Sequence, residues 1–358
     1  MAKRKEKKKK LKSLVLLLFL TIVLLSTSTY AWFTANRSVT IDPINVRIAA
    51  SSGLQISTDA TEWKTLISNT DITTPTNWSG NTNQLPSQLA PVSTNGSVTN
   101  GYLNFYKGTV EGIKTGADAG KLALTATKSP AEAKGTTGDF IAFDIFLKVD
   151  DEAGADIYLE NGSGVKVKAE TTDKGLQYAA RYAFVIEGNV ASTATAAAAQ
   201  ALMSGNSSIV VEPNYDAHKA SGTNNASLYY GLSTTTAASG VAAVPYLGVK
   251  AAISTPIVLL DTNPGTGGTP SSTYFESVPT LYRTNVAYSD QDEEHKEAYK
   301  GSTKETNLLN AFHLSTGITK IRVYMWIEGQ DVDCENSASG SDLTYKLGFS
   351  LDDGNETP

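Results

Sequence analysis

Apolar side chains recur at every second position in several stretches of this chain, and that period belongs to strands. In residues 177–187, QYAARYAFVIE, the polar side chains Arg181 and Glu187 lie opposite the apolar face. The apolar face carries Tyr178, Ala180, Tyr182, Phe184 and Ile186. The same alternation runs through residues 321–328 (IRVYMWIE) and 343–352 (LTYKLGFSLD). The pattern predicts half-buried strands of an antiparallel sheet.

Another stretch, residues 139–149 (DFIAFDIFLKV), is apolar on both faces near its middle. Such a strand is expected at the centre of a sheet, where other layers cover both of its faces. Residues 155–159 (ADIYL) follow after a polar turn at 150–154. Two strand patterns separated by a short turn predict a hairpin.

Two polar spans, residues 59–120 and 188–310, interrupt these strands and are rich in Thr, Ser, Gly and Asn. We interpret them as long insertions between core strands; a second small domain is the alternative. The second span contains ASTATAAAAQALMSG, which predicts a short helix. Because helical patterns are otherwise scarce, residues 32–358 are expected to be all-β. The simplest architecture is an antiparallel two-sheet sandwich or jelly roll with one or two short helices.

The N-terminus combines a basic cluster with an apolar run. The first twelve residues, MAKRKEKKKKLK, contain eight Lys and Arg, and such a cluster stays on the cytoplasmic side of a membrane. Residues 14–25 (LVLLLFLTIVLL) have the length of a signal-peptide core. Ala31 supplies a small residue before the cleavage point, with Thr29 two positions earlier. Residues 1–31 are therefore predicted to be a signal peptide that signal peptidase cuts between Ala31 and Trp32.

An uncleaved membrane anchor is the alternative for this segment. Residues 14–33 would span about 30 Å of hydrocarbon as a helix, with Tyr30, Trp32 and Phe33 as interfacial aromatics. Under both interpretations the rest of the chain is expected outside the cytoplasm, as a secreted or cell-surface protein. It would meet the membrane only through its N-terminal segment.

Charge and cysteine content narrow the choice of partners. Without residues 1–31, which hold eight basic residues and one acid, the chain keeps 22 basic and 35 acidic residues and a net charge of −13. An acidic body repels nucleic acid and anionic lipid, so neither is an expected partner. The one cysteine, Cys334, excludes an internal disulfide, and we expect it to be a partly buried thiol rather than an interchain link.

No catalytic residue is predicted. His218, His295 and His313 have no metal-ligand spacing to one another, and residues 292–300 (DEEHKEAYK) are typical of a solvated helix. The chain also lacks a GxSxG sequence and the phosphate-binding glycine patterns. We therefore expect a non-enzymatic protein; a secreted hydrolase would need two carboxylates that only the fold brings together.

Two acidic groupings offer the hard oxygen ligands that calcium prefers. One comprises Asp331, Asp333 and Glu335, and the other comprises Asp290, Asp292, Glu293 and Glu294. Neither follows a calcium-loop template, and a solvated turn is the ordinary interpretation. Calcium is thus the one cofactor that the sequence leaves open. Glycan binding would depend on Trp63, Trp78 and the pair Tyr229–Tyr230, which no sequence pattern groups together.

The segment after the predicted cut is itself strand-like. Val39 and Ile41 share one alternation phase, whereas Ile44, Val46 and Ile48 share the opposite one. The phase switches at Asp42-Pro43, and proline belongs at a bulge or an edge because it donates no hydrogen bond. The sequence predicts one bulged strand at a sheet edge.

The Lys-rich start, short apolar core and TYAWFT sequence resemble the SipW-type signal peptides of Gram-positive bacteria. These precede exported proteins of the TasA/camelysin type, which are cut after an alanine that stands before an aromatic residue. Three further segments, FDIFLKVDD…ADIYLENGSGV, RYAFVIEG and IRVYMWIEGQDVDCENSASGSDLTYKLGF, resemble core strands of clostridial surface proteins with this signal. The resemblance covers residues 1–58, 139–187 and 316–351. The long insertions depart from the compact TasA pattern.

The resemblance implies a jelly-roll subunit of extracellular matrix (biofilm) filaments. Residues 32–48 would then act as a donor strand that completes a sheet of the next subunit, and pairing within its own domain is the alternative. Partners would be signal peptidase, other copies, or other matrix and surface proteins. Some camelysin-type proteins are labelled metalloproteases, but this chain has no zinc motif. The competing hypothesis is a membrane-anchored monomeric adhesin or glycan-binding surface module, with ligand contacts in the insertions.

Overall fold

Strands make up nearly all the regular structure of the computed structural model. It describes residues 39–40, 48–50, 54–119, 122–159, 163–167, 176–212, 247–258, 273–278, 280–282, 309–331, 334, 340 and 342–351. Within these ranges the α-helices are α2 (Asn69–Thr73) and α3 (Ala196–Gln200), the latter where the alanine-rich stretch predicts a helix. Thr195 caps α3, because its side chain accepts a hydrogen bond from the Ala198 amide.

The main sheet has six strands in the order β18-β14-β13-β20-β10-β3. Its neighbours are antiparallel except for β14 and β18. The bounds are β3 (Leu54–Ser57), β10 (Ile141–Val149), β13 (Ala180–Val190), β14 (Ile209–Glu212), β18 (Thr280–Tyr282) and β20 (Gly317–Ile327). In the centre of the sheet, Ile321 pairs with Ile145 on one side and with Ile186 on the other.

The second sheet has the order β19-β11-β21-β2-β4, and β12 also pairs with β21. The bounds are β2 (Ile48–Ala50), β4 (Leu66–Ile67), β11 (Ala155–Leu159), β12 (Gly164–Val167), β19 (Leu309–Leu314) and β21 (Leu343–Ser350). β2 runs parallel to β21, whereas the other pairs are antiparallel.

The two sheets pack face to face through the predicted apolar faces. The Phe184 ring of β13 lies 5.4 Å from the Phe312 ring and 5.8 Å from the Phe349 ring, both in the second sheet. The Tyr182 hydroxyl lies 2.7 Å from the Gly164 carbonyl and 2.8 Å from the Lys346 carbonyl, so it bridges the sheets. These contacts confirm the all-β sandwich; jelly-roll connectivity is not confirmed.

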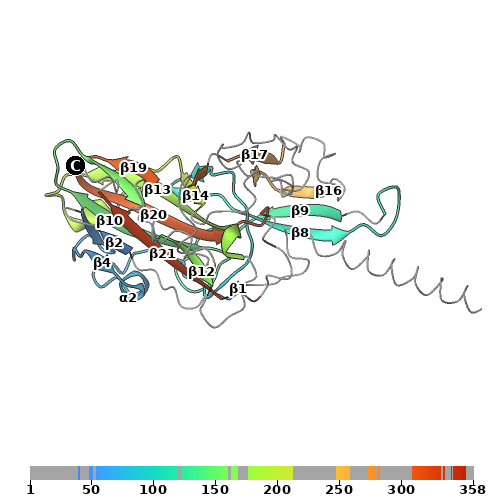
Figure 1. Ribbon diagram of the computed structural model, residues 1–358, viewed down its shortest axis with the longest axis horizontal. Coiled ribbons are helices and arrows are strands. Elements are labelled where there is room, and N and C mark those ends of the chain that lie inside the picture. Colours follow the sequence, from blue (N-terminus) through green and yellow to red (C-terminus); the bar gives the residue numbers. More distant parts are fainter. Residues whose placement is uncertain are drawn as a thin grey trace, which may run out of the picture.

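Smaller strands extend from the sandwich, and Figure 1 shows the hairpin β8–β9 projecting away from the long strands. β8 (Tyr106–Gly112), β9 (Leu122–Lys128) and β16 (Ile253–Val258) form a three-stranded sheet. The remaining pairs are β1 (Val39–Thr40) with β5 (Gln88–Leu89), β6 (Val98–Thr99) with β7 (Tyr102–Leu103), and β15 (Leu247–Val249) with β17 (Phe275–Ser277). Leu124, Val110 and Ile253 belong to a small apolar core of this extension.

The prediction of half-buried strands is wrong for the main sheet. Every residue of β20 is buried, and so are Arg181 and Glu187 on the polar face of β13. Side chains of the first insertion cover this face: the Phe105 ring lies 5.3 Å from the Trp326 ring. The alternation correctly located the inner face of these strands. On their outer face, however, segments of the first insertion lie where the sequence predicted solvent.

The predicted hairpin between residues 139–149 and 155–159 is also wrong. β10 pairs with β20 and β3, whereas β11 pairs with β19 and β21 in the other sheet. The turn therefore carries the chain from one sheet to the other, because strands from elsewhere occupy both edges of β10. The span 188–310, interpreted as an insertion, likewise contributes β14 and β18 to the main sheet.

Truncating Phe184 to alanine should cost about 3–5 kcal/mol of unfolding free energy, because it leaves a cavity between the two sheets. Urea denaturation of protein lacking residues 1–31 measures the effect. The matched control is Val258→Ala on β16, where the valine is 37% exposed and its truncation should cost far less. Equal losses for the two variants would contradict the placement of Phe184 in the inter-sheet core.

Candidate functional site

The N-terminal strand β2 fills a place inside the second sheet. Ile48 pairs with Leu347 of β21 on one side and with Ile67 of β4 on the other. The strand beyond β2, β4, is only two residues long, so β2 lies close to the edge of the second sheet. Three residues, 51–53, separate β2 from β3, which belongs to the main sheet.

Two of the predicted donor-strand residues are described, and both pair within their own chain. Val39 of β1 pairs with Leu89, and Ile48 lies in β2. Ile41, Ile44 and Val46 lie outside the described residues, as does the predicted cleavage site at Ala31 and Trp32. In a single chain the described parts of this segment thus adopt the intramolecular pairing that the sequence left as the alternative.

A second candidate site lies on the outer face of the main sheet, where charged side chains are buried together. Arg322 of β20 donates through Nε to Glu132 Oε2 at 2.8 Å, and its Nη1 lies 3.0 Å from Asp144 Oδ1. Burial raises the pKa of Glu132, against the opposing effect of Arg322. Burial lowers the pKa of Arg322, but the nearby Asp144 and Glu132 outweigh that effect, so the guanidinium stays charged. The cluster is thus a buried cation, Arg322, held between two carboxyl groups.

Beside the cluster, a pocket of about 360 Å³ opens over β10 and β20. Its floor holds Lys320 and Asp144, which are 3% and 1% exposed, with Lys320 Nζ 3.6 Å from Asp144 Oδ2. Lys320 Nζ also donates to the Gln200 carbonyl at 3.1 Å and lies 5.1 Å from the centre of the Trp78 ring. Tyr102 lines the pocket too, and Arg322 Cζ lies 5.5 Å from its ring centre.

A further buried ion pair accounts for one of the calcium candidates. Asp331 Oδ2 lies 2.6 Å from Arg181 Nη2, and both side chains are fully buried. Asp331 is thus the counter-ion of Arg181, while Asp333 and Glu335 lie outside the described residues, as do Asp290, Asp292, Glu293 and Glu294. Among the described residues, no group of three His, Cys, Asp or Glu side chains is placed to hold a metal ion.

Glu328 is a buried carboxylate at the end of β20. Its Oε2 accepts from Trp326 Nε1 and its Oε1 accepts from the Gln330 amide, each at 3.1 Å. Burial raises the pKa of Glu328 to about 7, although these hydrogen bonds and one with Ser93 act in the opposite direction. Glu328 therefore titrates near neutral pH.

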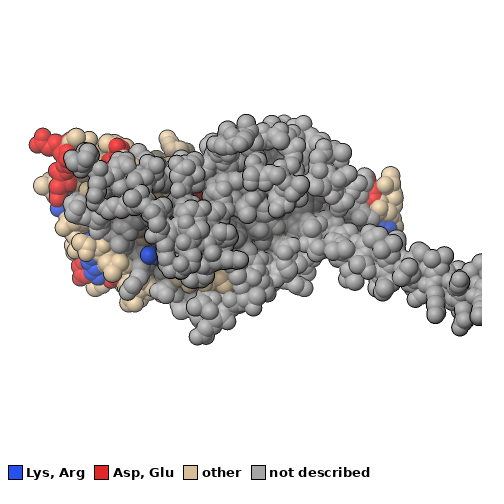
Figure 2. All heavy atoms as spheres, viewed as in Figure 1, with Lys and Arg blue, Asp and Glu red and all other residues tan. Residues whose placement is uncertain are grey.

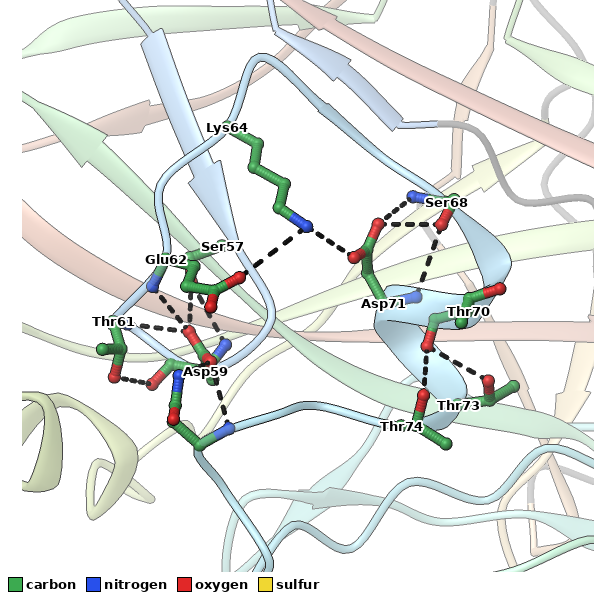
Figure 3. Close-up of polar contacts among 11 residues, drawn as sticks. Ser57, Asp59, Thr61, Glu62, Lys64, Ser68, Thr70, Asp71, Thr73 and Thr74 are labelled. Carbon is green, nitrogen blue, oxygen red and sulfur yellow. Dashed lines mark hydrogen bonds and ion pairs between the residues drawn. The ribbon is translucent and has the colours of Figure 1, made fainter.

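A third group of charged side chains surrounds the loop before α2, shown in Figure 3. Asp59 Oδ1 accepts from the Thr61 and Glu62 amides at 2.8 and 2.9 Å, and Lys64 Nζ lies 2.6 Å from Asp71 Oδ1. Burial would raise the pKa of Asp59, but the hydrogen bonds from Glu62 and Thr61 outweigh it and lower that pKa. The cavity among these residues is about 10 Å³, room for about one water molecule. This group stabilises a loop rather than forming a ligand site.

The other residues singled out in the sequence do not assemble. His313 lies on β19 with its Nδ1 2.8 Å from Asp156 Oδ1, both side chains being more than half exposed, and His218 and His295 lie outside the described residues. Trp63 packs against the small apolar cluster that contains Phe146 without lining the pocket, and Tyr229–Tyr230 are not described. Cys334 is buried in the inter-sheet core.

The sequence identified Trp78 but missed Tyr102, Lys320 and Asp144 as its neighbours. The sequence did contain an indication of these neighbours. Asp144 interrupts an apolar strand pattern, and Lys320 and Arg322 lie on the same face of a second strand. On the molecular surface in Figure 2, acidic side chains of the described residues gather at the upper left tip of the sandwich end, and basic and acidic side chains lie together below it.

No helix among the described residues is long and apolar enough to cross a bilayer, and residues 14–33 are not among them. Comparisons with protein-family models, with curated proteins and with solved structures gave no match.

The raised pKa of Glu328 predicts a pH-dependent stability. Below about pH 4.5 Glu328 is protonated in both the folded and the unfolded protein. As the pH rises towards 7, Glu328 ionises first in the unfolded protein, so the free energy of unfolding falls. Glu328→Gln removes this loss. Between pH 5 and pH 8 the unfolding free energy of the variant should therefore gain roughly 2–3 kcal/mol relative to the unmodified protein.

Urea denaturation at the two pH values measures this change. Gln at position 328 also loses one acceptor, so the informative quantity is the change with pH and not the absolute stability. The exposed Glu152→Gln serves as control and should follow the unmodified protein. Parallel pH profiles for Glu328→Gln and the unmodified protein would refute the proposed titration.

Proposed function

We propose that this protein is an exported, non-enzymatic structural component of a bacterial surface or extracellular matrix, and that its copies join by strand exchange. The single observation that supports the proposal is the place of β2. A strand from the N-terminal segment completes the second sheet between β21 and β4, and only three residues connect it to the other sheet.

The exchange requires opening two short strands, β1 and β2. β1 is two residues long and β2 is three, so few ladder hydrogen bonds hold the segment. The same segment from a second copy would form the same pairs with Leu347 to Phe349, because β-strand addition relies on backbone hydrogen bonds. Exchanging an identical element costs little free energy overall, since the intermolecular pairs are the same as the intramolecular pairs that they replace.

Directional growth follows from the geometry of such a contact. Each copy donates its N-terminal segment to the next and accepts one from the previous copy. A heterologous contact that does not close on itself propagates as a filament. Cleavage between Ala31 and Trp32 would permit growth, because an uncut leader tethers the donor segment to the membrane.

Protein that begins at Trp32 should form filaments visible by electron microscopy, and deletion of residues 32–48 should abolish them. Ala49→Pro tests β2 alone and should also abolish the filaments. β2 has neighbouring strands on both sides, so the Ala49 amide faces one of them, and proline has no amide hydrogen to donate there. Ala49→Val keeps the amide and is the matched control. Filaments from the protein without residues 32–48 would eliminate strand exchange.

A synthetic peptide of residues 36–50 separates exchange from a folding defect. Added in excess to unmodified protein, it should occupy the acceptor edge and slow filament elongation. The same peptide with proline at position 49 should have no effect. Equal behaviour of the two peptides would contradict the role of this strand.

The N-terminus of the protein recovered from cells tests export independently. We expect Trp32 as the first residue, in the wall or medium fraction. Intact Met1 in the membrane fraction would instead support a monomeric adhesin on an uncleaved anchor.

A further inference from the structure

We propose that the pocket over β10 and β20 binds one pyranose ring of a neutral glycan. This site is independent of strand exchange, since it lies on the outer face of the main sheet and β2 belongs to the other sheet.

The pocket is assembled from four distant parts of the chain. β10 and β20 supply the floor, the first insertion supplies one wall, and α3 with the residues after it supplies another. The walls include Trp78 and Tyr102 from the first insertion and Ala197 and Gln200 from α3. A volume of about 360 Å³ lies within the range of small-molecule sites, which is about 300–1,000 Å³.

The walls suit the apolar face of a sugar ring. Trp78 and Tyr102 are half-buried, and each covers a cation of β20, so both rings are held in position. The Trp78 ring also meets Phe146 edge-on at 5.4 Å. Rigid aromatic rings offer a large contact area and a polar edge, which matches the C–H and O–H groups of a pyranose.

The floor suits vicinal hydroxyl groups. Lys320 Nζ carries three N–H donors and makes one hydrogen bond, to the Gln200 carbonyl, within the described structure. Asp144 Oδ1 is buried and, despite its ion pair with Arg322, has no hydrogen bond of good geometry among the described residues. A hydroxyl both donates and accepts, so two adjacent hydroxyls satisfy the lysine and the carboxylate together.

Charge balance selects a neutral ligand. Lys320 and Arg322 each face a carboxyl group, Asp144 or Glu132, and burial raises the pKa of Glu187, a third carboxyl group nearby. A phosphate would find no excess of positive charge, and no group of three His, Cys, Asp or Glu side chains among the described residues is placed to hold a metal ion. A wholly apolar ligand would desolvate the Lys320–Asp144 pair without replacing its hydrogen bonds with water. A neutral polyol keeps the ion pairs and supplies hydrogen bonds.

Isothermal titration and tryptophan fluorescence test the site with the full mature chain. The probes are mono- and trisaccharides of glucose, galactose, mannose and N-acetylglucosamine, with trigalacturonate and glucose 6-phosphate as charged comparators. We expect saturable binding of at least one neutral sugar and weaker binding of the charged ones.

Variants assign the binding to the pocket. Trp78→Ala removes a wall, and Ala197→Phe fills the space from an exposed position on α3 without touching the floor, so each should weaken binding at least about tenfold. Trp63→Phe lies outside the pocket and should bind normally. Failure of every neutral sugar to bind at 10 mM (~4 orders of magnitude above a micromolar Kd), binding that survives Ala197→Phe, or preference for the charged probes would each overturn the proposal.

Discussion

The burial of β10, β13 and β20 on both faces is the constraint on which the rest of the structure depends. Their inner face is an ordinary apolar sandwich core, but their outer face carries Asp144, Arg181 and Arg322. Desolvated charges are tolerated only when each has a partner, because removing one partner leaves an uncompensated charge in the interior. The connecting segments therefore do more than link strands: the first insertion supplies Phe105 to this layer, and the segment between β9 and β10 supplies Glu132.

The pocket lies where the segments that cover the outer face of the main sheet pack incompletely. Around Trp326 the first insertion packs tightly, with Phe105 stacked on Phe140 at 4.1 Å. Around Lys320 it packs less completely, and α3 approaches from the other side without closing the space. A layer that must cover charged as well as apolar side chains leaves polar groups at the base of any gap. Such a gap favours a ligand rich in hydroxyl groups over an apolar one.

The second sheet contains a short strand, β2, that is held by few hydrogen bonds. Its central strand β21 lies near the C-terminus, and the strand parallel to it, β2, comes from the N-terminal segment. Pairing between segments so far apart in the sequence carries a large entropic cost of loop closure. A short strand held in this way is the part of the fold on which the proposed exchange between copies rests.

From the sequence alone one could predict the strand class, the inner faces of β13, β20 and β21, and the short helix α3. These follow from apolar alternation and from the helix propensity of an alanine-rich stretch, which are local properties of the chain. The sequence did not determine that β10 and β11 lie in different sheets, that Arg181 and Glu187 are buried, or that Tyr102 joins Trp78 above Lys320 and Asp144. These features depend on long-range contacts, because a strand's period shows which way a side chain points, whereas its pairing partners and covering segments come from residues far along the chain.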